Sequence, residues 1–226
     1  MNNKSNELLS KTAYLEIRAA MRDGRIQPGE RMRERELSGD LDLGRTPVRE
    51  ALKRLEFEGF LVQTSENGLI YQKLTPADII EIHAVLALLL GLAHSEAARN
   101  ATDIEISTMR ELLQCLKESI DGELRDVLTI ARGLDQLIFA SARNRFLTAQ
   151  LQLIGDRVGL QSTGRSTLTR SERRHEFLAD TEKIVEAIAA RDCKHAEKYA
   201  RARAEHGLRS RLAMDAAAEA DHIVTY

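Results

Sequence analysis

The sequence has little of what builds a β-sandwich or a disulfide-bonded domain. Its 226 residues include no tryptophan, two cysteines and three prolines, and aromatic residues make up only 4% of the chain. Cys115 and Cys193 lie far apart and form no CxxC motif, which favours a protein with reduced thiols. The scarcity of proline and aromatic residues, beside abundant Ala, Leu, Glu and Arg, favours helices over sheets.

Long apolar runs are also missing, which argues against a membrane protein. The longest run, 84–93, is interrupted by Gly91 and is shorter than the roughly 18 residues that span a bilayer. The opening residues, MNNKSNELLSK, contain no apolar segment of the kind found in signal peptides. We therefore expect a cytoplasmic protein without a membrane partner.

Charge is abundant but balanced, so the total points to no particular partner. Charged residues make up 30% of the chain, and the formal net charge is -2 at pH 7. Residues 1–75 are nearly neutral and the remainder is slightly acidic. A surface for nucleic acid would therefore have to be a local cluster of cations.

One stretch places such a cluster at the start of an amphipathic helix. Residues 44–61 read GRTPVREALKRLEFEGFL, and Arg45, Thr46 and Arg49 come first. Pro47 suits the first helical turn, where a missing N–H costs nothing. An apolar stripe follows, formed by Val48, Ala51, Leu52, Leu55 and Phe57. The polar end suits an anion and the stripe suits a small core, as in a DNA-recognition helix.

The segments around this helix predict a winged helix-turn-helix domain over residues 1–73. The expected order is a helix over about 6–23, a short helix over 33–40, the recognition helix over about 46–58, and short strands at 60–62 and 69–71. The Asn67-Gly68 pair between the strands is a strong hairpin signal.

The remaining residues, 74–226, are predicted to form an all-helical bundle of about six helices. No convincing strand follows Thr75, and the apolar spacing stays helical. Pockets form between facing helices in such bundles. The predicted fold class is therefore mainly α, with one small β-hairpin in the N-terminal domain.

Several motifs resemble those of a known family. The run DGRIQPGERMRERELSGDLDLGRTPVREALKRLEFEGFL carries PGE, EREL, RTPVREAL and LEFEGF at spacings that resemble the DNA-binding domain of GntR-type transcription regulators. The helical remainder resembles, more loosely, the FCD-type sensing domain of the FadR branch, with AIAARD as the shared pattern. The resemblance implies a DNA-binding regulator with an effector-binding and dimerisation domain, and not an enzyme.

The resemblance implies DNA contacts at the second helix, the recognition helix and the wing. The positions are Arg35, Gly44, Arg45, Thr46, Pro47, Arg49 and Gly68. An arginine there can donate two hydrogen bonds to guanine, and helix N–H groups suit phosphate. The chain departs from the family at Gly44, where Ser or Thr is usual, and at Asn67, where Arg is frequent. Outside this motif, a solvated helix face would be the commoner role of such arginines.

The resemblance also implies a metal site, but most of its ligands are missing. Sensing domains of this branch often hold a divalent metal with an Asp, a His four residues later and two further His. Asp135 matches the aspartate, whereas Phe139, Thr181 and Arg203 stand at the histidine positions. His206, one turn later, replaces the last ligand only if the helix is shifted. We therefore expect no bound metal and no other cofactor.

The pocket between these helices can exist without the metal. Arg203 can pair with Asp135 or hold an anion, and Phe139 makes the pocket more apolar. His83 stands where the family often has Arg, and it can donate to a carboxylate or simply be satisfied within its helix. We hypothesise a small organic acid as effector, contacted by His83, Asp135, Phe139, Thr181, and Arg203 or His206.

A regulator of this kind is expected to be a homodimer that reads an inverted-repeat operator and releases it when a metabolite binds. Two other classes stay open. A metal-dependent helical-bundle hydrolase is disfavoured by the broken ligand spacing and by the lack of a nucleophile motif. A winged-helix adaptor for proteins would show no salt-dependent affinity for DNA.

Overall fold

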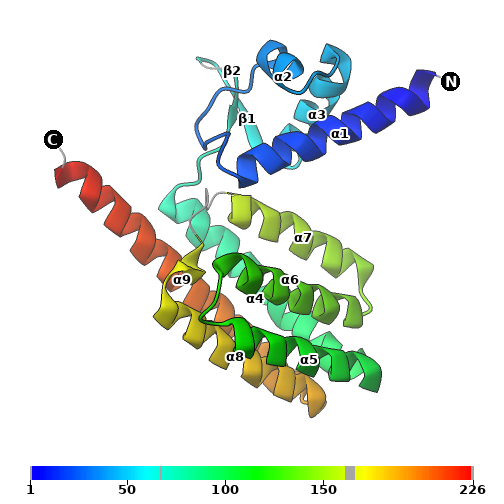
Figure 1. The fold of residues 1–226 in the computed structure, drawn as a ribbon, viewed down its shortest axis with the longest axis vertical. Helices are drawn as coiled ribbons and strands as arrows, with labels where there is room; N and C mark the ends of the chain where they lie inside the picture. Colours follow the sequence, from blue (N-terminus) through cyan, green and yellow to red (C-terminus); the bar gives the residue numbers. More distant parts are fainter. Residues whose placement is uncertain (1, 67, 161–165, 225–226) are drawn as a thin grey trace. The chain divides into compact units, whose positions relative to one another are not determined.

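The computed structural model describes residues 2–66, 68–160 and 166–224. The chain divides into two compact units, Met1–Thr75 with Gly155–Arg165, and Pro76–Ile154 with Ser166–Tyr226. The described residues are mainly helical, with one antiparallel hairpin in the first unit (Figure 1). The predicted fold class is confirmed. The division of roles between residues 1–73 and 74–226 stays a prediction.

The first unit contains the predicted helices and hairpin in the predicted order. Its elements are α1 Asn2–Arg22, α2 Glu34–Asp40, α3 Arg45–Phe57, β1 Leu61–Thr64 and β2 Gly68–Tyr71. The strands pair antiparallel, with Leu61 opposite Tyr71 and Thr64 opposite Gly68. Arg31 adds an antiparallel bridge to Ile70, which brings a third segment to the hairpin. Asn67 of the predicted turn lies outside the described residues.

The core of the first unit forms where α3 packs on α1. Val48 and Leu55 of α3 are fully buried, as is Ile17 of α1. Burying each such side chain contributes about 1.5–3 kcal/mol. Phe57, which was predicted to belong to the same stripe, is 93% exposed. It follows Val48 by about two and a half helical turns, so it lies on the opposite face of α3.

The second unit is a helical bundle. Its helices are α4 Pro76–Asn100, α5 Asp103–Ser119, α6 Leu124–Ser141, most of α7 Arg145–Leu160, α8 Ser171–Ala189 and α9 Cys193–Val224, with a 3₁₀ turn η1 at Thr167–Thr169. Residues 155–160 of α7 belong to the first unit. α4 packs along α9, and α8 packs on α9 and α5 (Figure 1). Met109, Ile138 and Ile184, from α5, α6 and α8, are fully buried in the main core. Five helices contribute to this core, because Ala97 of α4 and Ala196 of α9 also belong to it.

α4 is more apolar than the sequence analysis recognised. By length and composition alone it could cross a membrane, with a mean hydropathy of 1.8 over an 18-residue window. In the bundle, Ala93 and Ala97 are fully buried, whereas Leu88 is 53% exposed. α4 is therefore a packed helix with one apolar face uncovered.

Candidate DNA-binding surface and effector domain

The N-terminal end of α3 presents polar groups outward. Gly44 is the N-cap residue, with extended backbone (φ -61°, ψ 154°) and no side chain to cap the helix. Arg45 and Thr46 are exposed in the first turn, whereas Pro47 is buried. The first N–H groups of a helix have no partner within it and carry partial positive charge. This end of α3 can therefore bind an anion. Pro47 lies in the first helical turn with its side chain buried toward the core.

Arg49 is held by a carboxylate of α2. Its Nε donates to Glu34 Oε2 at 2.9 Å and its Nη2 donates to Glu34 Oε1 at 2.7 Å. The Arg49 guanidinium lowers the pKa of the Glu34 carboxyl. Because both side chains are partly exposed to water, the pair contributes little to stability. Arg49 can therefore exchange Glu34 for another anion at small cost.

Three further arginines offer unpaired charge on the first unit. Arg31, Arg35 and Arg45 are exposed, and none forms an ion pair within the part of the chain that the structure describes. Two of these side chains belong to α2 and the start of α3, the two helices of the helix-turn-helix. The nearly neutral domain thus displays free cations beside the predicted recognition helix.

The wing carries a cation that the sequence analysis missed. Gly68 has a φ of 69°, a left-handed conformation that favours glycine. A Cβ built on Gly68 would lie 3.4 Å from Arg31 Nη2. Arg31 thus stands beside the wing glycine, near the place where the family often has an arginine in sequence. Arg31 is brought close to Gly68 by the bridge between Arg31 and Ile70, which joins segments far apart in the sequence. Local sequence patterns do not predict this contact.

Inside the second unit, Arg203 joins three helices. It is 7% exposed and donates from Nη2 to Asp135 Oδ1 at 2.7 Å. Its Nη1 lies 3.4 Å from Thr181 Oγ1, and its guanidinium stacks over the Phe177 ring at 5.4 Å. α9 is thereby tied to α6 and α8. Three predicted effector residues come together here, and they already satisfy one another.

This arrangement does not fit a divalent metal. The Asp135 carboxylate is occupied by a guanidinium, whose positive charge would repel a metal cation. Phe139 and Thr181 stand at two of the expected histidine positions, and neither side chain has an imidazole that could bind a metal. Thr181 is fully buried beside Arg203. Within the described ranges, no three His, Cys, Asp or Glu residues are grouped as a metal site requires.

His94 is a buried polar residue that the sequence analysis did not single out. It is 0% exposed, and its Nδ1 lies 2.7 Å from the Leu90 carbonyl oxygen. Its Nε2 has no hydrogen-bond partner among the described residues. Its ring meets Phe139 edge to face at 6.0 Å. Burial, together with the charge of Arg203, lowers the pKa of His94 to about 4, so its ring is neutral at pH 7.

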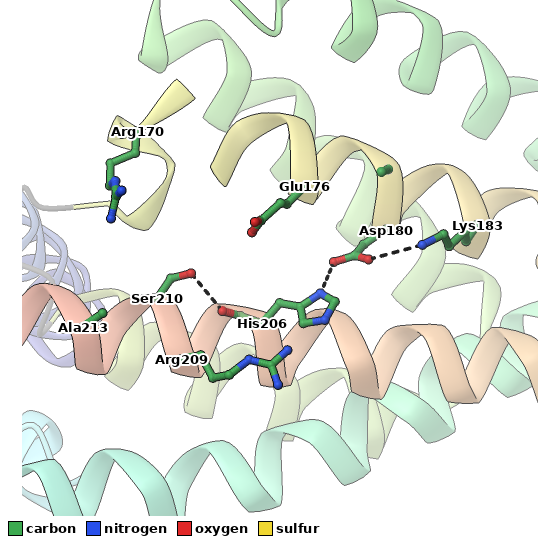
Figure 2. A pocket seen from close by; sticks show the side chains of 9 residues that line it. Arg170, Glu176, Asp180, Lys183, His206, Arg209, Ser210 and Ala213 are labelled. Carbon is green, nitrogen blue, oxygen red and sulfur yellow. Dashed lines mark hydrogen bonds and ion pairs between the residues drawn. The ribbon is translucent and has the colours of Figure 1, made fainter. Parts of the chain in front are cut away.

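The two predicted effector histidines, His83 and His206, lie in different surroundings. His83 is 8% exposed, and its Nδ1 lies 2.8 Å from the Ile79 carbonyl oxygen of its own helix. Burial lowers the pKa of His83. His206 Nδ1 lies 2.6 Å from Asp180 Oδ2, beside a hollow between α8 and α9 (Figure 2). Phe139 contacts the ring of His94, and the charge of Arg203 acts on the same His94 ring.

Known proteins resemble both units. Residues 9–70 match the family model described as bacterial regulatory proteins of the gntR family, and residues 81–206 match the FCD domain. The Nta operon transcriptional regulator of Aminobacter aminovorans is 32% identical over 133 residues, which are 59% of this chain and 63% of that protein. The match therefore spans less than two thirds of that relative.

Two more comparisons cover most of the chain. YdhC of Bacillus subtilis, an uncharacterized HTH-type transcriptional regulator, is 24% identical over 195 residues, which are 85% of this chain and 86% of YdhC. The structure of E. coli McbR/YncC superposes with a TM-score of 0.72 and 20% identity, covering 91% of this chain and 96% of that one. At this identity, the structural likeness shows the shared fold alone.

Proposed function

Because this chain belongs to the GntR family of bacterial transcription regulators and carries an FCD domain, we propose that it is a repressor that binds an inverted-repeat operator as a homodimer. Its role is regulatory and not catalytic. It acts in the cytoplasm, where the chromosome lies, and needs no membrane partner. A small organic acid bound by the FCD domain releases the DNA.

The observation that carries the DNA-binding role is the group of exposed cations around the start of α3. Arg35, Arg45 and Arg49 lie on the two helices of the helix-turn-helix. An arginine that donates two hydrogen bonds to guanine contributes about 1–3 kcal/mol of discrimination between bases. Gly44, Thr46 and the free N–H groups of α3 suit phosphate, with Pro47 fixing the turn. The wing, with Gly68 and Arg31, suits the adjacent minor groove.

The effector role rests on the polar residues within the second unit. In this proposal, Arg203 exchanges the Asp135 carboxylate for that of the ligand, because both are anions of similar geometry. The other proposed contacts are His83, Phe139, Thr181 and His206. A ligand changes operator affinity only if it prefers one arrangement of the dimer. Opening the Arg203–Asp135 pair provides a structural difference that a ligand can select.

A mobility-shift series on operator fragments selected from genomic DNA tests the DNA-binding role. We expect Arg45→Ala and Arg49→Ala to lose specific binding, because each removes a donor to base edges or phosphates. Lys53→Ala is the matched control, since it removes one exposed cation farther along the same helix. Full affinity in both arginine variants, or wild-type binding that does not depend on salt, would exclude this assignment.

A further inference from the structure

Two adjoining hollows lie between α8, η1 and the middle of α9. The larger has a volume of ≈ 540 Å³ and the smaller ≈ 120 Å³. Both are lined by Arg170, Glu176 and Ser210, so they form one continuous depression. The larger falls within the roughly 300–1,000 Å³ of typical small-molecule sites. Neither is lined by Asp135 or Arg203, the pair inside the bundle.

A buried guanidinium without a hydrogen-bond acceptor faces the smaller hollow. Arg173 lines it and is 6% exposed, and its Nε and Nη1 have no hydrogen-bond partner within the described residues. Glu176 forms an ion pair with Arg173, with its Oε2 3.6 Å from Arg173 Nη1, but its side chain is 63% exposed. Burial lowers the pKa of Arg173. A buried cation is costly unless acceptors compensate it, and the mostly exposed Glu176 gives Arg173 an ion pair but no hydrogen bond. Arg173 therefore has unused donors for a further anion.

The other charges around the hollows define which anion fits. Arg170, Lys183 and Arg209 add three cations to Arg173. Figure 2 shows Arg170 and Glu176 extending from the α8 side toward α9. Three carboxylates, Glu172, Glu176 and Asp180, also line the depression. The cations therefore exceed the carboxylates by one charge.

Asp180 is already engaged. It lies 2.6 Å from His206 Nδ1 and 4.0 Å from Lys183 Nζ. The Asp180 carboxylate therefore divides its charge among His206, Lys183 and Arg173. A doubly charged anion would also be repelled by the exposed Glu172 and Glu176. An anion with a single negative charge would balance the one excess positive charge. Ala179, Ala213 and Met214 add apolar surface to the walls.

We propose that this depression is a binding site for a small organic monocarboxylate with an apolar body. Its oxygens accept hydrogen bonds from Arg173, and Arg170 and Arg209 add charge at the rim. The ligand contacts both α8 and α9 and fixes their packing. The site shares His206 with the proposed effector contacts but is not lined by the Arg203–Asp135 pair, and it does not depend on DNA binding.

Calorimetric titration of the full-length protein with sodium benzoate tests the site, and benzamide is the neutral comparator of the same shape. We expect benzoate to bind, benzamide not to bind, and inorganic phosphate to bind more weakly than benzoate. Arg173→Met should weaken benzoate at least roughly tenfold, because a hydrogen bond to a charged group is lost.

A second variant, a double substitution of exposed residues, keeps the proposal testable if Arg173→Met fails to fold. Arg170→Ala with Arg209→Ala changes exposed residues only, and should also weaken benzoate roughly tenfold. Lys194→Ala with Lys198→Ala removes the same charge elsewhere on α9 and should leave binding unchanged. Equal binding of benzoate and benzamide, no binding of benzoate, or unchanged affinity in both arginine variants overturns the proposal. The titrations contain no DNA, so their failure leaves the operator-binding proposal untouched.

Discussion

Arg203 reaches across the helical bundle and donates a 2.7 Å hydrogen bond to Asp135, so a cation of the chain itself neutralises this carboxylate. Arg203 also contacts Thr181 on a third helix. The guanidinium therefore cross-links α9 to α6 and α8. The energetic consequence can be measured.

We expect Arg203→Met to lower the free energy of unfolding by about 2–3 kcal/mol, because Asp135 loses its partner in a partly buried place. The value lies below the roughly 3–5 kcal/mol expected when a fully buried pair is broken, since the Asp135 side chain is 31% exposed and water screens its charge. Urea denaturation of the purified protein provides the measurement.

Two further variants make this result specific. Arg110→Met breaks the exposed pair with Glu186 and should cost less than about 1 kcal/mol. Adding Asp135→Leu to Arg203→Met should restore part of the loss, because the unpaired carboxylate is then removed. Strict additivity of the two substitutions would show that the pair is not energetically coupled.

The pair between Glu34 and Arg49 predicts an effect on DNA affinity. Glu34→Gln removes the carboxylate that competes with DNA for Arg49. We expect this variant to bind operator more tightly than wild type, with little change in stability, because the pair is exposed. Fluorescence anisotropy at several salt concentrations measures both affinity and salt slope.

Glu36→Gln is the matched control for this experiment. Glu36 belongs to the same helix and pairs with Arg33 instead of Arg49. An equal gain in both variants would mean that general charge, and not the release of Arg49, raises the affinity. A loss of affinity in Glu34→Gln would instead show that Glu34 orients Arg49 for binding.

The sequence predicted the helix-turn-helix well because local signals define it. Apolar spacing placed Val48 and Leu55 in the core, and Gly68 marked the hairpin. The prediction was wrong for Phe57, because this residue lies half a turn around the helix from Val48 and is exposed. Positions set by local spacing were thus predictable, provided that the helical period was applied strictly.

Contacts between distant segments were harder to predict. The possible pairing of Arg203 with Asp135 was anticipated because a resemblance supplied the register of the two helices. The approach of Arg31 to Gly68 and the burial of His94 and Arg173 depend on how elements pack. Sequence spacing contains no direct signal for such packing, so these residues emerged only from the structure.

The position of Arg31 beside the wing leads to a prediction about DNA binding. Arg31→Ala should weaken operator binding and lower the salt slope by about one, because one phosphate-seeking cation is lost. Stability should change by less than about 0.5 kcal/mol, since Arg31 is exposed. Salt-dependent anisotropy together with urea denaturation measures the two effects, and Arg25→Ala, an exposed arginine before the hairpin, is the control.

The buried His94 predicts sensitivity to acid. Its pKa is about 4 in the folded protein, against an ordinary value of 6.5, so the unfolded chain binds the proton more readily. The stability that His94 contributes is therefore present above pH 6.5 and is lost as the pH falls toward 4. Between pH 7 and pH 5 the loss is about 2 kcal/mol from this residue.

Substituting this side chain should remove that part of the acid sensitivity. Urea denaturation measures the free energy of unfolding at pH 7 and at pH 5. The decrease between these two pH values should be smaller by about 2 kcal/mol in His94→Leu than in wild type. The acid loss that persists in the variant reports other groups, among them His83, whose pKa is also lowered by burial. An unchanged pH dependence in His94→Leu would mean that His94 is hydrated or protonated in the folded protein, because only a dry and neutral imidazole couples folding to pH in this way.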